Sequence, residues 1–331
     1  MSIFVEDWGA VYGSPYQIDP DDEVVVETEL IEDGDRIVFH EGKGDLRPLA
    51  FVDGVRRPEG VLYCLDAATG VQTRGIAGAY ACGAVVTGRG RPAKITREYI
   101  ERLLVWGGGV HRLLPDVPGG WHWEIFSIQE THPDKIGQEL QVRMRKAEGR
   151  LADELCREGF LTLVDGPLTF VRERDAAVVG FVKTHHRRLL DLRHHSRLPE
   201  LSPGQRTSLF TLGKDRYSAY LRLTRGAPIS GRWSGIVRIE LPQAAGLGPA
   251  IAIADLVTSA LPLYAGVAHA DPRAPQNLQP VGALEKLLRR RLGDRSMAQR
   301  AVRDAVRRAI ARETDPELAA PFSVPLSMHS L

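Results

Sequence analysis

Short apolar runs, each bounded by Gly, Pro or Asp, recur through the first half of the chain and predict β-strands. Residues 23–40 contain two extended runs around an Asp33-Gly34 pair, which predicts a β-hairpin. Three further runs, PLAFVDG, GVLYCLDA and GIAGAYACGAVVTG, follow between residues 48 and 88 and predict a three-stranded meander. Residues 88–135 keep neither the strand nor the helix period, and we interpret them as a helix with an irregular insertion.

A longer period begins at residue 136 and predicts the clearest helix, over 136–158. Its apolar positions recur at i+3 and i+4 and define one buried stripe: Ile136, Leu140, Met144, Ala147, Leu151 and Leu155. Two buried strands are predicted next, in FLTLVDG and AAVVGFVKT, and residues 198–245 again favour strands. The remaining pattern predicts helices over 249–260, 281–293 and 296–312, of which the last two are rich in arginine.

The predicted elements between residues 48 and 182 follow the order strand, strand, strand, long helix, strand, strand. A meander followed by a crossover helix and parallel strands is the order of an RNase H-like core. The fold class expected is therefore α/β, an RNase H-like mixed sheet flanked by helices. Residues 1–47 would form an N-terminal extension with a β-hairpin, and residues 48–331 one domain with helical insertions.

Composition limits how this domain could bind nucleic acid and in which cellular compartment we expect it. The 331 residues carry a formal net charge of +1, so binding to nucleic acid would depend on local basic patches. The N-terminus has acids where a signal peptide needs basic residues, and we expect neither a membrane span nor a secretory leader. Cys64, Cys82 and Cys156 form no CxxC pair, which favours reduced thiols and a cytoplasmic protein.

Three acids stand at the ends or edges of these predicted elements. Asp53 ends the first strand of the meander, Glu148 borders the apolar stripe of the long helix, and Asp165 ends the strand that follows it. Each acid alone has an ordinary interpretation, a turn aspartate or a solvated helix glutamate. Together they predict a carboxylate site for Mn²⁺ or Mg²⁺, the chemistry used in two-metal phosphodiester cleavage.

Other polar residues are candidates for supporting roles. Lys183 follows an apolar strand and could neutralise a phosphate or transition-state charge, and His269 is a candidate ligand or proton carrier with Asp271 as a nearby competitor. The segment THHRRLLDLRHHSR contains Arg187, Arg188 and two histidine pairs. We interpret it as a basic segment that contacts phosphates rather than as a zinc site.

The chain resembles the NurA family of DNA end-processing nucleases. The resemblance depends on short motifs that occur in the expected order between residues 48 and 275: AFVDGVRR, Glu148 on the helix, LVDGPL, VVGFVKT, DRYSAYLRL and LPLYAGVAHAD. It implies a nuclease that uses Mn²⁺ or Mg²⁺ on single- and double-stranded DNA. It also implies a homodimer that docks onto HerA, a hexameric ring ATPase.

The resemblance also implies roles for individual residues. Asp53, Glu148, Asp165 and His269 would hold metal, and Lys183 would lie near the scissile phosphate. Tyr220 and Arg222 would be weaker candidates for contact with DNA or with the active site. Apart from the resemblance, Arg56, Arg187 and Arg188 are further weak candidates for contact with DNA.

Two alternative functions stay open. Val55 follows the first Asp-Gly, where the family often has Ser or Thr, so a DNA-binding and docking subunit with weak or no catalysis is the runner-up. A metalloenzyme that binds zinc through the histidine pairs is the third possibility.

Overall fold

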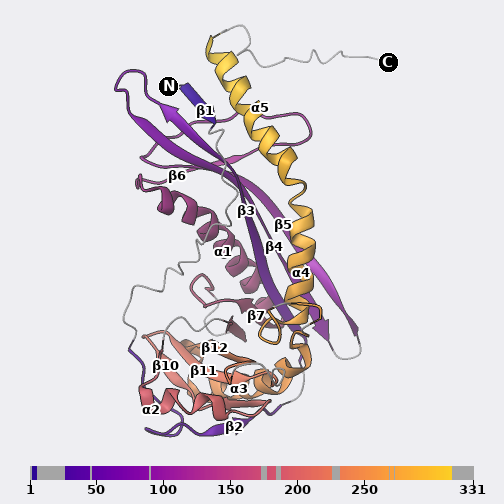
Figure 1. Cartoon of the computed structure of the whole chain (residues 1–331). Helices are drawn as coiled ribbons and strands as arrows, with labels where there is room; N and C mark the ends of the chain where they lie inside the picture. The colour runs from indigo at the N-terminus through magenta and orange to yellow at the C-terminus, as the bar shows by residue number, and fades with distance from the viewer. Residues whose placement is uncertain are drawn as a thin grey trace.

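A computed structural model describes residues 2–5, 27–44, 47–88, 91–172, 177–183, 188–225, 232–267, 269–271 and 273–314. Over these residues the protein is α/β, with one mixed sheet of twelve strands flanked by helices (Figure 1). The main path through the sheet runs β2-β9-β11-β12-β8-β7-β3-β4-β5-β6, while β1 pairs with β3 and β10 pairs with β11.

Three long antiparallel strands form the meander: β3 (Leu49–Leu65), β4 (Gln72–Gly88) and β5 (Arg91–Trp106). PLAFVDG and GVLYCLDA were predicted as separate strands, but both runs belong to the single strand β3. The register between β3 and β4 shifts between Pro58 and Gly60, and this irregularity lets β3 continue through both residues. The third strand is β5, so the interpretation of residues 88–135 as a helix and insertion was wrong over 91–106. Most residues of β5 between positions 92 and 100 are exposed, so the sequence shows no alternation of apolar and polar residues there.

The predicted N-terminal hairpin is also wrong over its described residues. Gly34 does lie in a turn, with φ of 65°, but the two arms bind other strands instead of each other. Leu30 bridges to Phe210, and β2 (Phe39–Glu41) pairs with β9 (Gln205–Thr207). β1 (Ser2–Val5) pairs with the far end of β3, so both β1 and β2 join the common sheet. Residues 23–26 lie outside the described part of the chain.

The predicted long helix is confirmed as α1 (Pro133–Arg157), and all six residues of its apolar stripe are buried. The helix packs on β3 and β4 and carries the chain to β7 (Leu161–Asp165), which lies parallel to β3. β8 (Val178–Val182) then adds parallel to β7. These two strands and the meander give the local order β5-β4-β3-β7-β8.

Other helices cover the opposite face of the sheet. α3 (Leu247–Ala260) and α4 (Gln279–Arg291) share a core cluster with side chains of β3, β4 and β7. α5 (Arg295–Thr314) packs against β1 and β3, so α4 and α5 follow one side of the long strands while α1 lies on the other (Figure 1). The remaining elements are β6 (Glu124–Ser127), β10 (Phe210–Leu212), β11 (Arg216–Arg222), β12 (Ile236–Pro242) and α2 (Leu192–His195).

The segment Leu247–Tyr264, which contains α3, is the one described segment long and apolar enough to cross a membrane. In this fold α3 contacts β9, β11 and β12, and Leu256, Val257 and Ala260 of the segment lie in the core. The segment therefore acts here as a core helix of the α/β domain.

Candidate metal centre

Two aspartates meet because β3 and β7 run side by side in the same direction. Val52 of β3 is paired with Val164 of β7, so Asp53 and Asp165 each occupy the next position along their strands. Glu285 reaches them from α4, on the face of the sheet opposite α1. One carboxylate oxygen from each of these three acids lies within 4.8 Å of the other two. The arrangement offers three hard oxygen ligands to a single cation.

Glu285 was not predicted, although the sequence held a signal for it. It lies on the buried stripe of α4, four residues after Val281 and three before Leu288, where an apolar residue is the normal choice. A buried acid at such a position requires a partner.

Glu148 approaches the same strand from α1 on the other face. Its side chain is 1% exposed, and a Cβ placed on Gly54 would lie 2.5 Å from its Oε1 atom. Any residue larger than glycine at position 54 would therefore collide with this carboxylate. Glu148 lies outside the triplet formed by the other three acids, but it is close enough to raise the pKa of Asp53.

Two of these carboxylates have an oxygen with no partner among the residues that the structure describes. They are Oδ2 of Asp53 and Oε1 of Glu148, and both are buried. Burial, and then the charge of Asp165, raise the pKa of Asp53 well above its ordinary value. Burial also raises the pKa of Glu148, to about 7, although the neighbouring Arg145 acts in the opposite direction. Buried, unsatisfied carboxylates are costly, and a bound cation would remove that cost.

Lys183 and Arg145 contact Asp165 and Glu148 of this group. Lys183, directly after β8, places its Nζ atom 2.8 Å from Oδ2 of Asp165. Arg145, on α1, donates to Oε2 of Glu148 at 3.2 Å and to the backbone carbonyl of Asp165. The Arg145 guanidinium lies against Gly166, whose φ of 102° is a conformation that favours glycine.

The segment that leads into α4 closes the site from a third direction. Asn277, which is fully buried, accepts a hydrogen bond from Lys183 Nζ at 2.7 Å and donates to Asp271 at 2.5 Å. Arg273 binds both oxygens of Glu285, at 2.8 and 2.7 Å, and also contacts Asp271. Hydrogen bonds from Asn277 and Arg273 outweigh burial and lower the pKa of Asp271 to about 2. These residues link Lys183 to Glu285 through a continuous polar network.

Among the described residues, His269 is not part of the group formed by Asp53, Asp165 and Glu285. His269 lies exposed on a turn, and Asp271, its competitor, is the residue that enters the network. A metal-ligand role for His269 stays a prediction. Arg56 is half-buried and donates to Gln141, whereas Arg188 is exposed. Arg187 lies outside the described residues.

The expectation that Tyr220 and Arg222 contact DNA needs correction. Tyr220 is 1% exposed and stacks on Phe210 inside the core. Arg222 is also buried and donates to the carbonyl of Arg232. Both belong to β11, whose last five residues are buried, so neither side chain faces a surface that DNA could reach.

His194 and His195 of the basic segment have other partners. His194 contacts Asp191 at 2.7 Å, and the ring of His195 lies 4.8 Å from that of Trp233. Neither histidine belongs to a group of potential metal ligands in the described chain. His185 and His186 lie outside it.

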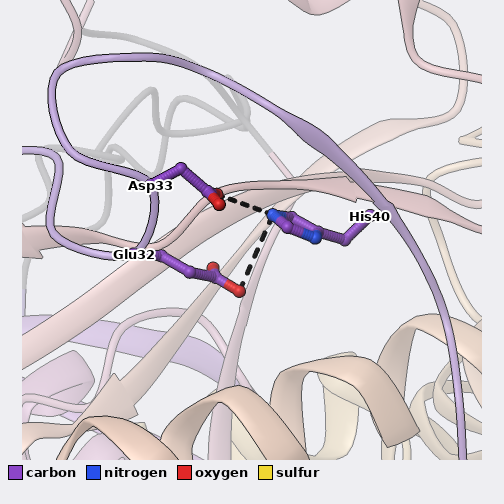
Figure 2. Close-up of side chains that lie close together, drawn as sticks. All are labelled: Glu32, Asp33 and His40. Carbon is purple, nitrogen blue, oxygen red and sulfur yellow. Dashed lines mark hydrogen bonds and ion pairs between the residues drawn. The ribbon is translucent and has the colours of Figure 1, made fainter.

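A second group of potential metal ligands is formed by Glu32, Asp33 and His40. The Nε2 atom of His40 lies 2.7 Å from Asp33 and 3.7 Å from Glu32 (Figure 2). Arg206, which is 1% exposed, also binds both oxygens of Glu32 and contacts Asp255 of α3 at 2.7 Å.

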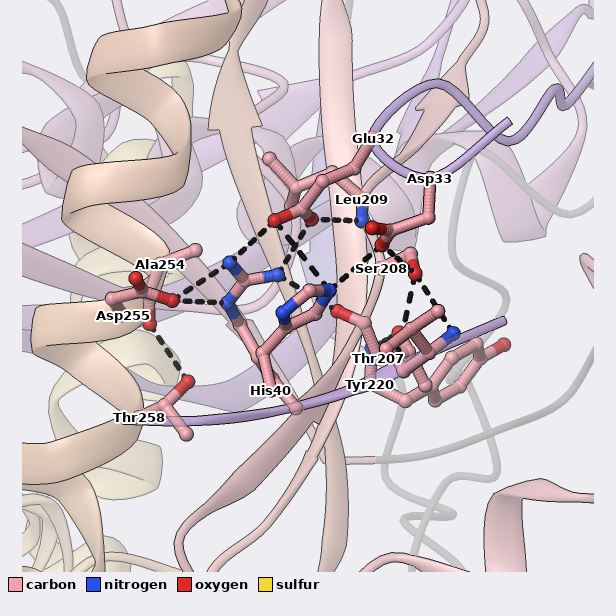
Figure 3. A network of polar contacts seen from close by, with 12 residues as sticks. Glu32, Asp33, His40, Thr207, Ser208, Leu209, Tyr220, Ala254, Asp255 and Thr258 are labelled. Atoms are coloured by element: carbon pink, nitrogen blue, oxygen red, sulfur yellow. Dashed lines mark hydrogen bonds and ion pairs between the residues drawn. The ribbon is translucent and has the colours of Figure 1, made fainter. Parts of the chain in front are cut away.

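The surrounding contacts indicate that this second group is structural. Glu32 accepts a further hydrogen bond from the backbone N–H of Leu209, and Asp33 accepts one from the hydroxyl of Ser208 (Figure 3). Although burial raises the pKa of Glu32, the hydrogen bond from Arg206 holds it below its ordinary value. An ionised carboxylate that already has a bidentate arginine partner is satisfied without a metal.

Comparison with protein-family models and with curated proteins finds no match.

Proposed function

We propose that the protein is a divalent-metal-dependent DNA nuclease. The observation that carries this proposal is the group of buried acids, Asp53, Asp165 and Glu285, with Glu148 beside them. Within the described part of the chain, Oδ2 of Asp53 and Oε1 of Glu148 have no hydrogen-bond partner, which fits a cation site better than a structural ion pair. Burial and the neighbouring charge of Asp165 raise the pKa values of both carboxyl groups, and such shifts are common at functional sites.

The arrangement of elements supports an RNase H-like core for this nuclease. The order β5-β4-β3-β7-β8, with α1 between β5 and β7, is the order that such a core requires. The acids come from the first strand, the crossover helix and the following parallel strand. The additional acid, Glu285, comes from a helix packed on the opposite face.

Each group has a defined part in phosphodiester hydrolysis. Asp53, Asp165 and Glu285 would hold one Mn²⁺ or Mg²⁺ ion, and Glu148 would complete the site. Such ions supply an activated water and stabilise charge on the reacting phosphate. Lys183, held against Asp165 by Asn277, keeps a positive charge at a fixed position beside the acids. Arg145 orients Glu148 from the other side.

DNA as the substrate is supported by the resemblance to the NurA family and by basic residues beside the acids. Arg289 and Arg290 are exposed on α4, one turn beyond Glu285, and could bind backbone phosphates. Homodimer formation, docking onto a HerA-like hexameric ATPase and a cytoplasmic location belong to the same proposal.

The test is cleavage of end-labelled single- and double-stranded DNA by the full chain in Mn²⁺, Mg²⁺ or EDTA. We expect metal-dependent cleavage that Asp53→Asn and Glu285→Gln reduce by at least about a hundredfold. Asp116→Asn is the matched control, because Asp116 is 75% exposed and pairs only with His122 among the contacts described. Near-normal cleavage by folded Asp53→Asn would refute the assignment.

One observation favours the runner-up, a docking subunit without catalysis. Val55, at the position where the resembling family often has a hydroxyl residue, is buried in the apolar core facing α3 and α4. Metal-dependent, salt-sensitive DNA binding without cleavage, both alone and with a ring ATPase, would support this alternative.

A further inference from the structure

Arg273 joins two acids while remaining half exposed itself. Its side chain is 49% exposed, whereas those of Glu285 and Asp271 are 10% and 14% exposed. The guanidinium binds both oxygens of Glu285 and both oxygens of Asp271. It therefore lies at the border between the buried acids and solvent.

The same carboxylate of Glu285 belongs to the triplet with Asp53 and Asp165. Arg273 thus supplies positive charge to an acid that also faces a candidate cation site. An arginine guanidinium stays charged in proteins, so Arg273 cannot leave Glu285 by losing a proton. Any reduction of its contact with Glu285 requires the side chain to move.

The charges around the site show why such a movement is favourable. Among the described residues, three cations lie within 3.2 Å of an acid of the site: Lys183, Arg145 and Arg273. Of these, Arg273 has the most exposed side chain, compared with 15% for Lys183 and 25% for Arg145. A divalent ion at the acids repels all three, and Arg273 is the one that can turn toward solvent at least cost.

We propose that Arg273 is a built-in counterion of Glu285 that a bound divalent cation displaces, and that the displaced guanidinium then binds a DNA phosphate. This inference rests on the proposed nuclease function and deepens it. It makes metal binding and DNA binding mutually reinforcing, because DNA gives the displaced arginine a new anionic partner. Arginine suits this exchange since its planar fork binds a carboxylate and a phosphate in the same bidentate manner.

The experiment compares Arg273→Gln with Arg308→Gln by calorimetric titration of Mn²⁺, in the absence and presence of phosphorothioate DNA that resists cleavage. Arg308 is the matched control: its side chain is 45% exposed and pairs at 2.9 Å with Asp304, an acid of α5 outside the candidate site. Without DNA, we expect Arg273→Gln to bind Mn²⁺ about tenfold more tightly than the wild type. DNA should tighten Mn²⁺ binding about tenfold in the wild type and in Arg308→Gln, and much less in Arg273→Gln.

Two outcomes separate the failure of this inference from that of the proposed function. If Asp53→Asn abolishes Mn²⁺ binding but Arg273→Gln matches the wild type with and without DNA, the counterion role is wrong and the metal site stands. If the wild type binds no Mn²⁺, or Asp53→Asn binds it equally well, the metal site itself is wrong.

Arg273→Lys keeps the test decisive if Arg273→Gln does not fold. A lysine keeps the charge but loses the bidentate contact, so we expect Mn²⁺ affinity without DNA to rise less than in Arg273→Gln. The gain on adding DNA should also fall below that of the wild type. Wild-type values for both quantities in Arg273→Lys would overturn the proposal.

Discussion

Glu148→Gln should stabilise the metal-free protein at neutral and alkaline pH. The substitution keeps the shape of the side chain and removes a carboxylate that is 1% exposed and has one unpartnered oxygen. Burial raises the pKa of Glu148 from 4.5 to about 7, so the folded protein holds this proton more tightly than the unfolded chain does. Stability contributed by the protonated form is fully present below pH 4.5 and is lost as the pH rises through about 7.

The size of this loss follows from the two pKa values. A pKa change from 4.5 to about 7 lowers the free energy of unfolding by on the order of 3 kcal/mol once the group is ionised in both states. Glutamine gives up the charged hydrogen bond from Arg145, which offsets part of the gain by about 1 kcal/mol. The variant should therefore exceed the wild type by about 2 kcal/mol at pH 8 and by little at pH 5.

Urea unfolding in EDTA at pH 5 and pH 8 measures this difference. Glu154→Gln is the control, because Glu154 lies on the same helix with a 40% exposed side chain and faces Arg97 at 3.8 Å. We expect the difference between Glu154→Gln and the wild type to be small and independent of pH. Glu148→Gln that is equally or less stable than the wild type at pH 8 would refute the argument.

Mn²⁺ should reverse the order of stability of the wild type and Glu148→Gln. A ligand that binds only the folded state stabilises it by mass action, so Mn²⁺ should raise the unfolding midpoint of the wild type more than that of Glu148→Gln. Mn²⁺ affinity of the wild type should also increase as pH rises through about 7, because Glu148 must lose its proton to bind a cation. An equal effect of Mn²⁺ on both proteins would exclude Glu148 from the metal site.

Two further substitutions test the surroundings. Gly54→Ala places a Cβ 2.5 Å from Oε1 of Glu148, so we expect metal-dependent cleavage to fall by about 10- to 100-fold while circular dichroism shows a folded protein; unchanged cleavage would contradict the close approach. Arg206→Met leaves Glu32 and Asp255 without their guanidinium partner and should lower the free energy of unfolding by about 3–5 kcal/mol in urea. A loss below about 1 kcal/mol would show that these ions are solvated rather than structurally paired.

Local sequence was sufficient for α1, α3, α4 and α5 and for strands buried on both faces. The apolar stripe from Ile136 to Leu155 specifies which side of α1 must be buried, because a helix repeats every 3.6 residues whatever it packs against. β7 and β8 were visible as short apolar runs for a similar reason: both of their faces are covered.

Strand pairing depended on residues far away in the sequence. The Asp33-Gly34 turn did not make a hairpin, because Leu30 and β2 pair with strands about 170 residues later in the chain. β5 was missed because most of its outer part is exposed, so no alternation of apolar and polar residues marked it.

The sequence by itself determined α1, α3, α4 and α5, most of the strands, and three of the four acids at the candidate site, Asp53, Glu148 and Asp165. Asp53 and Asp165 could be found because each follows a short apolar run. Asp53 lies inside β3 rather than at its end, but the two runs pair in parallel, Leu49–Val52 with Leu161–Val164, so the next residue of each lies at the same level of the sheet. Tertiary structure alone decided that Glu285 joins them and that Asn277 and Arg273 hold the charged groups around them. Those residues lie more than 100 positions later, and only the packing of α4 on the sheet brings them to the two aspartates.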